Sequence, residues 1–290
     1  EKNQITWFDR QGKVLGTVAE PAHFVNIRLS PDDLRAAVEL MDNIWVIDLE
    51  RSVENRFTFD ELGAGYAVWS PDGSKLLYGA HDIAPKGMKS KFSLKPTDGN
   101  AQPESIFEVE RLAFTNDWSP DGRYVIFLES TAGGDMDLYY IDLEHEKKPV
   151  PLLKREFEDL WGRFSPDGRW VAFVSNEAGS YQLYVMSFPD GKSKWQVSRE
   201  EISPGELSLS WRPGEILFQD LKGKIMSARV ETTGDSIRLS NPEVLFINPR
   251  IQDFDFSRDG RRIIATVLPE TAQVGSISLV TNWNAAFSQK

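Results

Sequence analysis

The amino-acid sequence predicts an all-β protein: a six-bladed β-propeller of four-stranded antiparallel blades, whose ring is closed by N-terminal strands that join the last blade. Three observations predict this fold. A short turn motif recurs six times, its successive copies start 40, 49, 46, 47 and 45 residues apart, and a full period holds four strand-like runs. A fixed period in the forties is typical of repeat folds. We expect a single domain over residues 1–290, with closing strands at 1–18 and repeats at about 19–59, 60–109, 110–154, 155–199, 200–247 and 248–290.

The motif has the form aromatic-Ser-Pro-Asp-Gly, and its residue types favour a tight turn. Its clearest copies are Trp69–Gly73, Trp118–Gly122 and Phe164–Gly168, and weaker copies begin at Leu29, Trp211 and Phe256. Proline fixes φ at the second turn position, aspartate bonds to nearby backbone N–H groups, and glycine takes the left-handed conformation that closes a hairpin. Asp33 replaces that glycine in the first copy and is one of the few residue types that tolerate the conformation. The large apolar residue that opens each copy is expected to fill the wedge between blades rather than to form an aromatic ligand platform.

Each strand of a blade has its own run of sequence. The N-terminal residues 5–18 read as a hairpin around a turn at 10–12. The apolar runs that follow the six turns are Leu34–Leu40, Lys75–Ala80, Tyr124–Glu129, Trp170–Ser175, Glu215–Gln219 and Arg262–Leu268. The third runs are Asn43–Leu49, Lys91–Pro96, Asp137–Leu143, Gln182–Phe188, Lys224–Val230 and Ser276–Trp283. The fourth runs, found in five repeats, are Asn55–Phe59, Glu104–Val109, Pro149–Leu153, Trp195–Ser198 and Pro242–Ile247.

The sixth repeat has no convincing fourth run, which leaves its blade incomplete. The N-terminal hairpin is expected to supply the missing outer strand and so to remove an exposed edge. Ile5–Phe8, however, resembles a third strand rather than a fourth. A five-stranded closing blade and the loss of an upstream half-blade therefore both remain open.

The composition excludes several classes of function. The net charge of -11 argues against a nucleic-acid or anionic-membrane surface, because both require a basic footprint. The chain has no cysteine, which excludes disulfides, thiolate nucleophiles and cysteine metal sites. No run approaches eighteen apolar residues, so we expect no membrane span in this chain. We also expect a monomeric domain.

The repeats resemble a known family. A Trp-Ser-Pro-Asp-Gly turn, an apolar strand and then a run such as Asp137–Leu143 is similar to the PD40, or TolB-like, WD40-like β-propeller repeat, and the resemblance covers about residues 5–283. At the two ends, Ile5–Lys13 and Leu279–Trp283 resemble the segments that bracket the propellers of some bacterial serine/threonine kinases. That resemblance implies a C-terminal sensory module of a larger receptor and a periplasmic or extracytoplasmic location. The chain itself has no kinase motif.

Candidate binding residues lie on the inner strands and on the loops opposite the turns, because propellers usually bind at that face and at the channel mouth. The candidates are Asn26, Arg28, Tyr66, His81, Asp82, Asp117, Trp161, Arg163, Asp253 and Asp255. Two residues before the motif serine, neighbouring repeats pair Asp117 with Arg163 and Asp255 with Arg28. We expect inter-blade ion pairs there; the alternative is a ring of polar groups that bind a ligand in the channel.

The sequence favours recognition over catalysis. It has no Gly-x-Ser-x-Gly elbow and no His-Glu-x-x-His motif, and its three histidines lie in separate repeats. We expect no cofactor, no metal site and no enzyme activity, and a protein, peptide or small ligand as the partner. The alternative is a propeller-type hydrolase or lyase that uses channel carboxylates and a metal.

Overall fold

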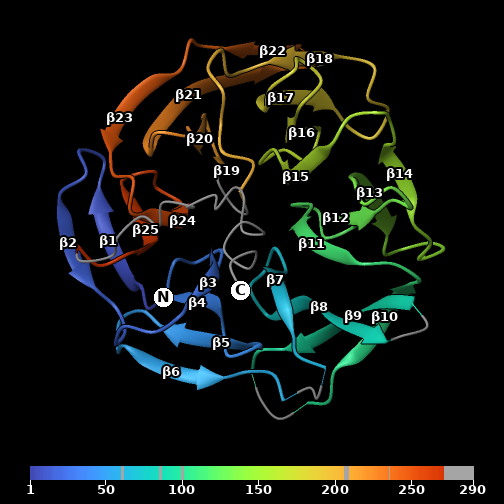
Figure 1. Cartoon of the computed structure of the whole chain (residues 1–290), viewed down its shortest axis with the longest axis horizontal. Coiled ribbons are helices and arrows are strands. Elements are labelled where there is room, and N and C mark those ends of the chain that lie inside the picture. Colours follow the sequence, from blue (N-terminus) through green and yellow to red (C-terminus); the bar gives the residue numbers. More distant parts are fainter. Residues whose placement is uncertain (60–61, 85–86, 99–100, 206–208, 235, 271–290) are drawn as a thin grey trace, which may run out of the picture.

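The chain folds as the predicted six-bladed propeller. The computed structural model describes residues 1–59, 62–84, 87–98, 101–205, 209–234 and 236–270, with the side chains at 83, 84 and 87 set aside. Its strands form six antiparallel sheets that stand radially around a common axis (Figure 1). The described residues contain no helix, and so none that is long and apolar enough to cross a membrane.

The first three blades each hold four strands in chain order, with the first strand next to the axis. Blade one consists of β3 (Val25–Leu29), β4 (Arg35–Leu40), β5 (Asn43–Asp48) and β6 (Val53–Arg56). Blade two consists of β7 (Gly65–Trp69), β8 (Lys75–Ala84), β9 (Gly87–Pro96) and β10 (Glu104–Val109). Blade three consists of β11 (Ala113–Trp118), β12 (Tyr124–Ser130), β13 (Met136–Asp142) and β14 (Val150–Leu153).

Blades four and five continue the pattern, and blade five adds a strand that the sequence did not predict. Blade four consists of β15 (Asp159–Phe164), β16 (Trp170–Ser175), β17 (Gln182–Ser187) and β18 (Lys194–Gln196). Blade five consists of β19 (Leu209–Arg212), β20 (Glu215–Gln219), β21 (Lys224–Thr233), β22 (Ser236–Leu239) and β23 (Glu243–Ile247). The long β21 pairs with β23 along its first half and with β22 along its second, so one strand position is shared by two short strands.

The closing blade contains four described strands, and the N-terminal hairpin supplies two of them. It consists of β24 (Ile251–Phe256), β25 (Arg262–Val267), β1 (Gln4–Asp9) and β2 (Val14–Thr17). β1 pairs with β25 over six residue pairs, from Gln4–Val267 to Asp9–Arg262. The hairpin therefore provides a third strand as well as an outer strand. Both edges of β25 are occupied, and the predicted run Ser276–Trp283 lies outside the described residues.

The motif forms the predicted turn between the first two strands of each blade. In blade two, Ser70 Oγ donates to Asp72 Oδ1 at 2.6 Å and accepts from Lys75 N at 2.9 Å. Gly73 has a φ of 69°, and Asp33 has a φ of 61° at the equivalent position of blade one. The same serine–aspartate bond forms in five of the six turns, and the fifth turn, with Arg212 in place of serine, lacks it.

The residue that opens the motif packs between blades. Leu29, Trp69, Phe164, Trp211 and Phe256 are buried, and Trp118 is half-buried. Trp211 of blade five joins an apolar cluster with Phe173 and Val174 of blade four. These contacts agree with the wedge-filling role.

Candidate functional site

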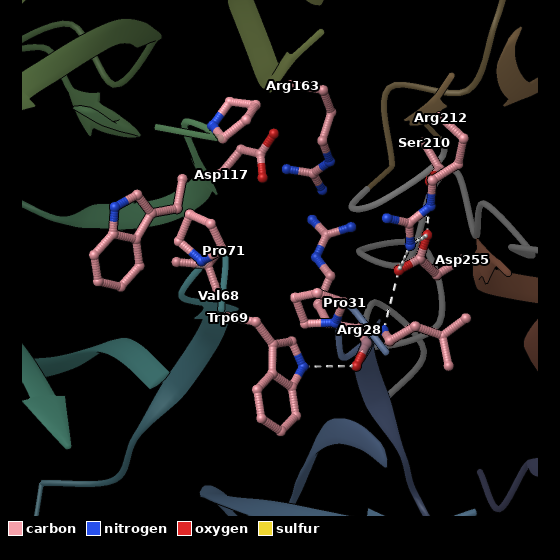
Figure 2. Close-up of a pocket in the computed structure, with 13 residues that line it drawn as sticks. Arg28, Pro31, Val68, Trp69, Pro71, Asp117, Arg163, Ser210, Arg212 and Asp255 are labelled. Atoms are coloured by element: carbon pink, nitrogen blue, oxygen red, sulfur yellow. Dashed lines mark hydrogen bonds and ion pairs between the residues drawn. The ribbon is translucent and has the colours of Figure 1, made fainter. Parts of the chain in front are cut away.

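A pocket lies on the axis at the end of the ring where the motif turns gather, and every blade contributes to its wall (Figure 2). Its volume is about 280 Å³. We call it the turn-side pocket; its wall and rim include Arg28, Val68, Asp117, Arg163, Ser210, Arg212 and Asp255 and the turn prolines Pro31, Pro71 and Pro120.

This position corrects one expectation from the sequence. Arg28, Asp117, Arg163 and Asp255 were expected at the face opposite the turns, but they line the same pocket as the turn prolines. The reason is their place at the ends of β3, β11, β15 and β24, immediately before the turns. Four of the ten candidate residues are therefore brought together, at the other end of the channel.

Asp255 joins three blades. Its carboxylate accepts hydrogen bonds from Leu29 N of blade one at 3.0 Å and from Ser210 Oγ of blade five at 2.6 Å. Arg212 Nη2 of blade five lies 3.1 Å from each carboxylate oxygen. Asp255 is 4% exposed, so these groups replace the water that a charged carboxylate requires. The ion pair of this aspartate is thus with Arg212, and the predicted pair with Arg28 is wrong.

Asp117 and Arg163 also join neighbouring blades, but through backbone groups. Asp117 Oδ2 accepts from Phe164 N at 2.7 Å, and the Arg163 guanidinium donates to the carbonyl oxygens of Asn116 and Leu209. No direct ion pair connects Asp117 to Arg163, so this second predicted pair is also wrong. The reason is that backbone N–H and C=O groups of the neighbouring blade lie closer to each charge than the opposite charge does.

The charges of the pocket remain partly unbalanced. Three arginines and two aspartates line it, which gives a formal charge of +1 within a protein whose net charge is -11. Burial raises the pKa of Asp117 to about 6, although the Phe164 N–H and Arg28 oppose the shift. Burial likewise lowers the pKa of Arg28, against the attraction of Asp255 and other acids.

A second group of candidates meets at the opposite end of the inner strands. The Tyr66 and Trp161 rings are nearly parallel, with centroids 6.4 Å apart, and Phe114 lies 4.4 Å from Tyr66. His81 packs edge-on against Phe114 at 5.0 Å and contacts Ser90 Oγ through Nδ1 at 3.0 Å. Burial lowers the pKa of His81, which favours its neutral form.

A pocket of about 470 Å³ opens beside this aromatic cluster, and Tyr66 and His81 line it together with Glu39, Met41 and Leu62. We call it the loop-side pocket. Asn26 Nδ2 and Tyr66 N both donate to Glu39 Oε1, which connects blades one and two beneath the pocket.

Three inner-strand candidates share an unusual backbone conformation. Asn26, Tyr66 and Trp161 have φ values of 56°, 55° and 54°, and each lies four residues before a motif serine. The ladders of their blades shift register at this point, so each residue forms a bulge. Aromatic residues with a left-handed backbone conformation are uncommon and strained, and strained residues are found often at functional sites.

The last two candidates line neither pocket, although the charge of Asp253 attracts Arg28. Asp253 is buried, and its Oδ2 accepts from Ile27 N of blade one at 2.5 Å. Asp82 is exposed on the β8–β9 hairpin, opposite Lys89. Among the described residues, no group of three or more His, Asp or Glu side chains is arranged to hold a metal ion.

Arg212 is the residue that sequence reasoning missed. It occupies the serine position of the fifth motif, where the other five copies have serine. That substitution was a signal, because an arginine cannot make the short serine–aspartate bond of the turn and must place its charge elsewhere. The structure places it on Asp255.

Comparison with known proteins supports the fold. No protein-family model matches the chain, and no curated protein matches it by sequence. A structure described as TolB of Agrobacterium tumefaciens superposes with a TM-score of 0.69 at 19% identity, covering 92% of this chain and 99% of that one. TolB of Acinetobacter baumannii gives a TM-score of 0.58 at 17% identity and covers 91% of this chain, which spans 63% of that protein.

An enzyme shares the same architecture. An oligogalacturonate lyase in complex with manganese superposes with a TM-score of 0.58 at 15% identity, covering 91% of this chain and 82% of that one. At such identities the likeness extends to the fold alone, since one fold hosts both binding proteins and enzymes. The chain is a propeller of the TolB-like architecture that its repeats indicate.

Proposed function

We propose that this chain is a non-catalytic recognition module and that its turn-side pocket receives one group of a protein, peptide or small ligand. One observation carries the proposal. All six inner strands contribute to a single pocket on the axis, and that pocket combines apolar walls with charged groups. Binding sites of this mixed kind occur where several elements converge.

The size of the pocket supports insertion of a small group. A volume of about 280 Å³ falls just below the range of roughly 300–1,000 Å³ for pockets that enclose drug-sized ligands. One side chain, a chain terminus or a small metabolite fits such a volume. The TolB likeness of the fold adds support for a protein partner.

Variants at the rim test the proposal. Pro71→Tyr and Pro120→Tyr introduce bulk at exposed turn positions of the rim without a change of charge. Pro166→Tyr is the matched control, because Pro166 occupies the same exposed turn position in blade four but does not line the pocket. Each loss of proline is expected to lower stability by at most about 1 kcal/mol.

The measurement is quantitative affinity capture from a cell extract, followed by mass spectrometry. Partners should be retained by the wild type and by Pro166→Tyr and lost by the two rim variants. Equal capture by all four proteins would exclude the turn-side pocket as the binding site. A further variant, Leu62→Glu, tests the loop-side pocket, whose rim carries this exposed leucine. If only Leu62→Glu loses the partner, binding belongs to the loop-side pocket instead.

The proposal extends to the larger protein. The resemblance of Ile5–Lys13 to kinase-attached propellers supports a sensory domain of a bacterial receptor kinase; Leu279–Trp283, the other half of that resemblance, lies outside the described residues. The full-length gene tests this extension, because it should encode a kinase domain and one membrane-spanning helix before residue 1.

A further inference from the structure

Two arginines of the turn-side pocket face each other, and each has side-chain N–H groups without a hydrogen-bond partner among the described residues. Arg28 and Arg163 are 9% and 4% exposed, and Figure 2 shows their guanidinium groups turned toward one another across the pocket. They come from blades one and four, on opposite sides of the ring. Two buried like charges repel each other unless an anion lies between them.

Neither arginine forms an ion pair with an acid of the described residues, although Asp255, Asp253 and Asp117 attract Arg28 at longer range. The side chain of Arg28 makes no hydrogen bond and no ion pair within 4.0 Å among the described residues. The bond from Trp69 Nε1 is to the backbone oxygen of Arg28, not to its guanidinium group. Arg163 uses Nε and Nη1 on backbone carbonyls, and its Nη2 is buried without a partner. An unmatched buried donor of a charged group is costly, because it has lost water and gained nothing in exchange.

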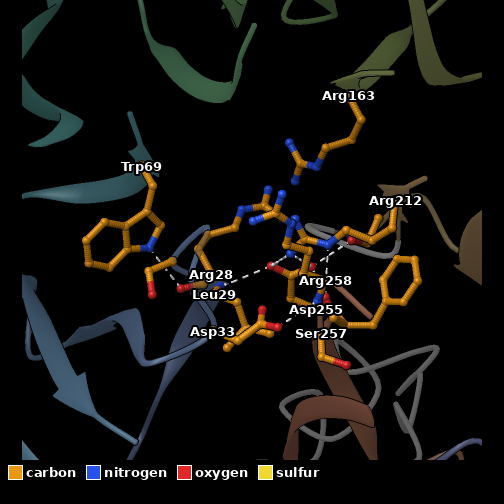
Figure 3. Close-up of polar contacts among 12 residues, drawn as sticks. Arg28, Leu29, Asp33, Trp69, Arg163, Arg212, Asp255, Ser257 and Arg258 are labelled. Carbon is orange, nitrogen blue, oxygen red and sulfur yellow. Dashed lines mark hydrogen bonds and ion pairs between the residues drawn. The ribbon is translucent and has the colours of Figure 1, made fainter. Parts of the chain in front are cut away.

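The three carboxylates that attract Arg28, those of Asp255, Asp253 and Asp117, each accept a hydrogen bond from a backbone N–H group of a neighbouring blade. Asp255 is bonded to Arg212 and to Leu29 N, as Figure 3 shows, and it also accepts from Ser210 Oγ. Asp117 is bonded to Phe164 N. The free donors therefore have no ion-pair partner within the part of the chain that the structure describes.

We propose that Arg28 and Arg163 bind an oxyanion, a carboxylate or a phosphate, which the ligand inserts into the turn-side pocket. The planar guanidinium fork matches both groups and binds them through paired N–H donors. This inference rests on the proposed function, since it names the chemistry of the group that the same pocket receives. It also explains why a protein with a net charge of -11 keeps a positive pocket on its axis.

The test is isothermal titration of the full chain with sodium phosphate, sodium acetate and a tripeptide with a free or amidated C-terminus, at constant ionic strength in sodium chloride. At least one oxyanion should bind with a stoichiometry of one. Phosphate alone would assign a phosphate ligand, and acetate with the free but not the amidated tripeptide would assign a carboxylate.

Variants decide whether the binding belongs to this pair. Arg28→Gln removes no side-chain hydrogen bond and should fold; it should weaken binding by about 10- to 100-fold, the effect of one charge-assisted hydrogen bond. Arg28→Lys keeps the charge and should weaken binding less. Arg261→Gln is the matched control, since Arg261 is 84% exposed outside the pocket, and it should bind like the wild type.

Absence of binding by any of the oxyanions, or equal binding by Arg28→Gln and Arg261→Gln, would overturn the inference. These failures are distinct from failure of the proposed function. If the rim variants Pro71→Tyr and Pro120→Tyr still lose partner capture while no anion binds, the pocket receives an uncharged group. If anions bind but capture is unchanged, the site exists and the partner docks elsewhere.

Discussion

Removal of the Asp255 carboxylate should be among the most destabilising single changes in this propeller. The carboxylate connects the closing blade to blade one through Leu29 N and to blade five through Ser210 and Arg212. It therefore holds two of the six blade interfaces, those on either side of the closing blade. Asp255→Ala removes all of these bonds at once.

The magnitude follows from the contacts that are lost. Breaking a buried ion pair by deleting one partner costs about 3–5 kcal/mol, because the other charge remains without compensation. Arg212 keeps some contact with water, as 23% of its side chain is exposed, which favours the lower part of that range. We expect a loss of about 3–4 kcal/mol in the free energy of unfolding.

Urea denaturation followed by tryptophan fluorescence measures the loss. A change of this size lowers the midpoint by about 1 M or more, given m values of roughly 1–3 kcal/mol/M. Asp82→Ala is the control, because Asp82 is exposed, and it should change stability by less than about 0.5 kcal/mol. A loss below about 1 kcal/mol for Asp255→Ala would refute the view that this carboxylate holds the closing blade to its two neighbours.

Three further predictions concern charge, backbone and metal. Asp117→Asn should raise the free energy of unfolding by about 1–3 kcal/mol at pH 8 and by little at about pH 4. The folded protein holds the Asp117 proton up to a pKa of about 6, whereas the unfolded chain releases it at about pH 4, so wild-type stability falls between these two values and is lowest above them. A loss at pH 8 in urea titrations would contradict this. Gly223→Ala should lower the free energy of unfolding by more than about 3 kcal/mol or prevent folding, because the new Cβ would lie 2.4 Å from Pro249 Cα. Gly179 is the control: it is also left-handed but faces open space, so Gly179→Ala should cost about 1 kcal/mol in the same titrations. The melting temperature should be unchanged by EDTA, calcium or zinc; a rise of several degrees with either ion would instead favour the metal-dependent hydrolase or lyase.

Much of the candidate site followed from the sequence, but its arrangement did not. The charged residues two positions before the motif serine were identified from the repeat alone, and Arg28, Asp117, Arg163 and Asp255 do meet. Their partners were wrongly predicted because opposite charges at equivalent positions suggest ion pairs, whereas the inner strands offer closer backbone groups. A bulge at Asn26, Tyr66 and Trp161 also shifts the alternation of side chains, so strand periodicity could not predict where these side chains point.

The sequence by itself determined the number of blades and the turn that begins each one. Those features depend on bonds within six residues, such as Ser70 Oγ to Asp72 and Lys75, and the serine–aspartate bond recurs in five of the six copies of the motif. Only the tertiary structure decided that β1 rather than a later run pairs with β25, and that Arg28 and Arg163 face each other across one pocket. Those features depend on residues more than a hundred positions apart, whose contacts exist only after the ring has closed.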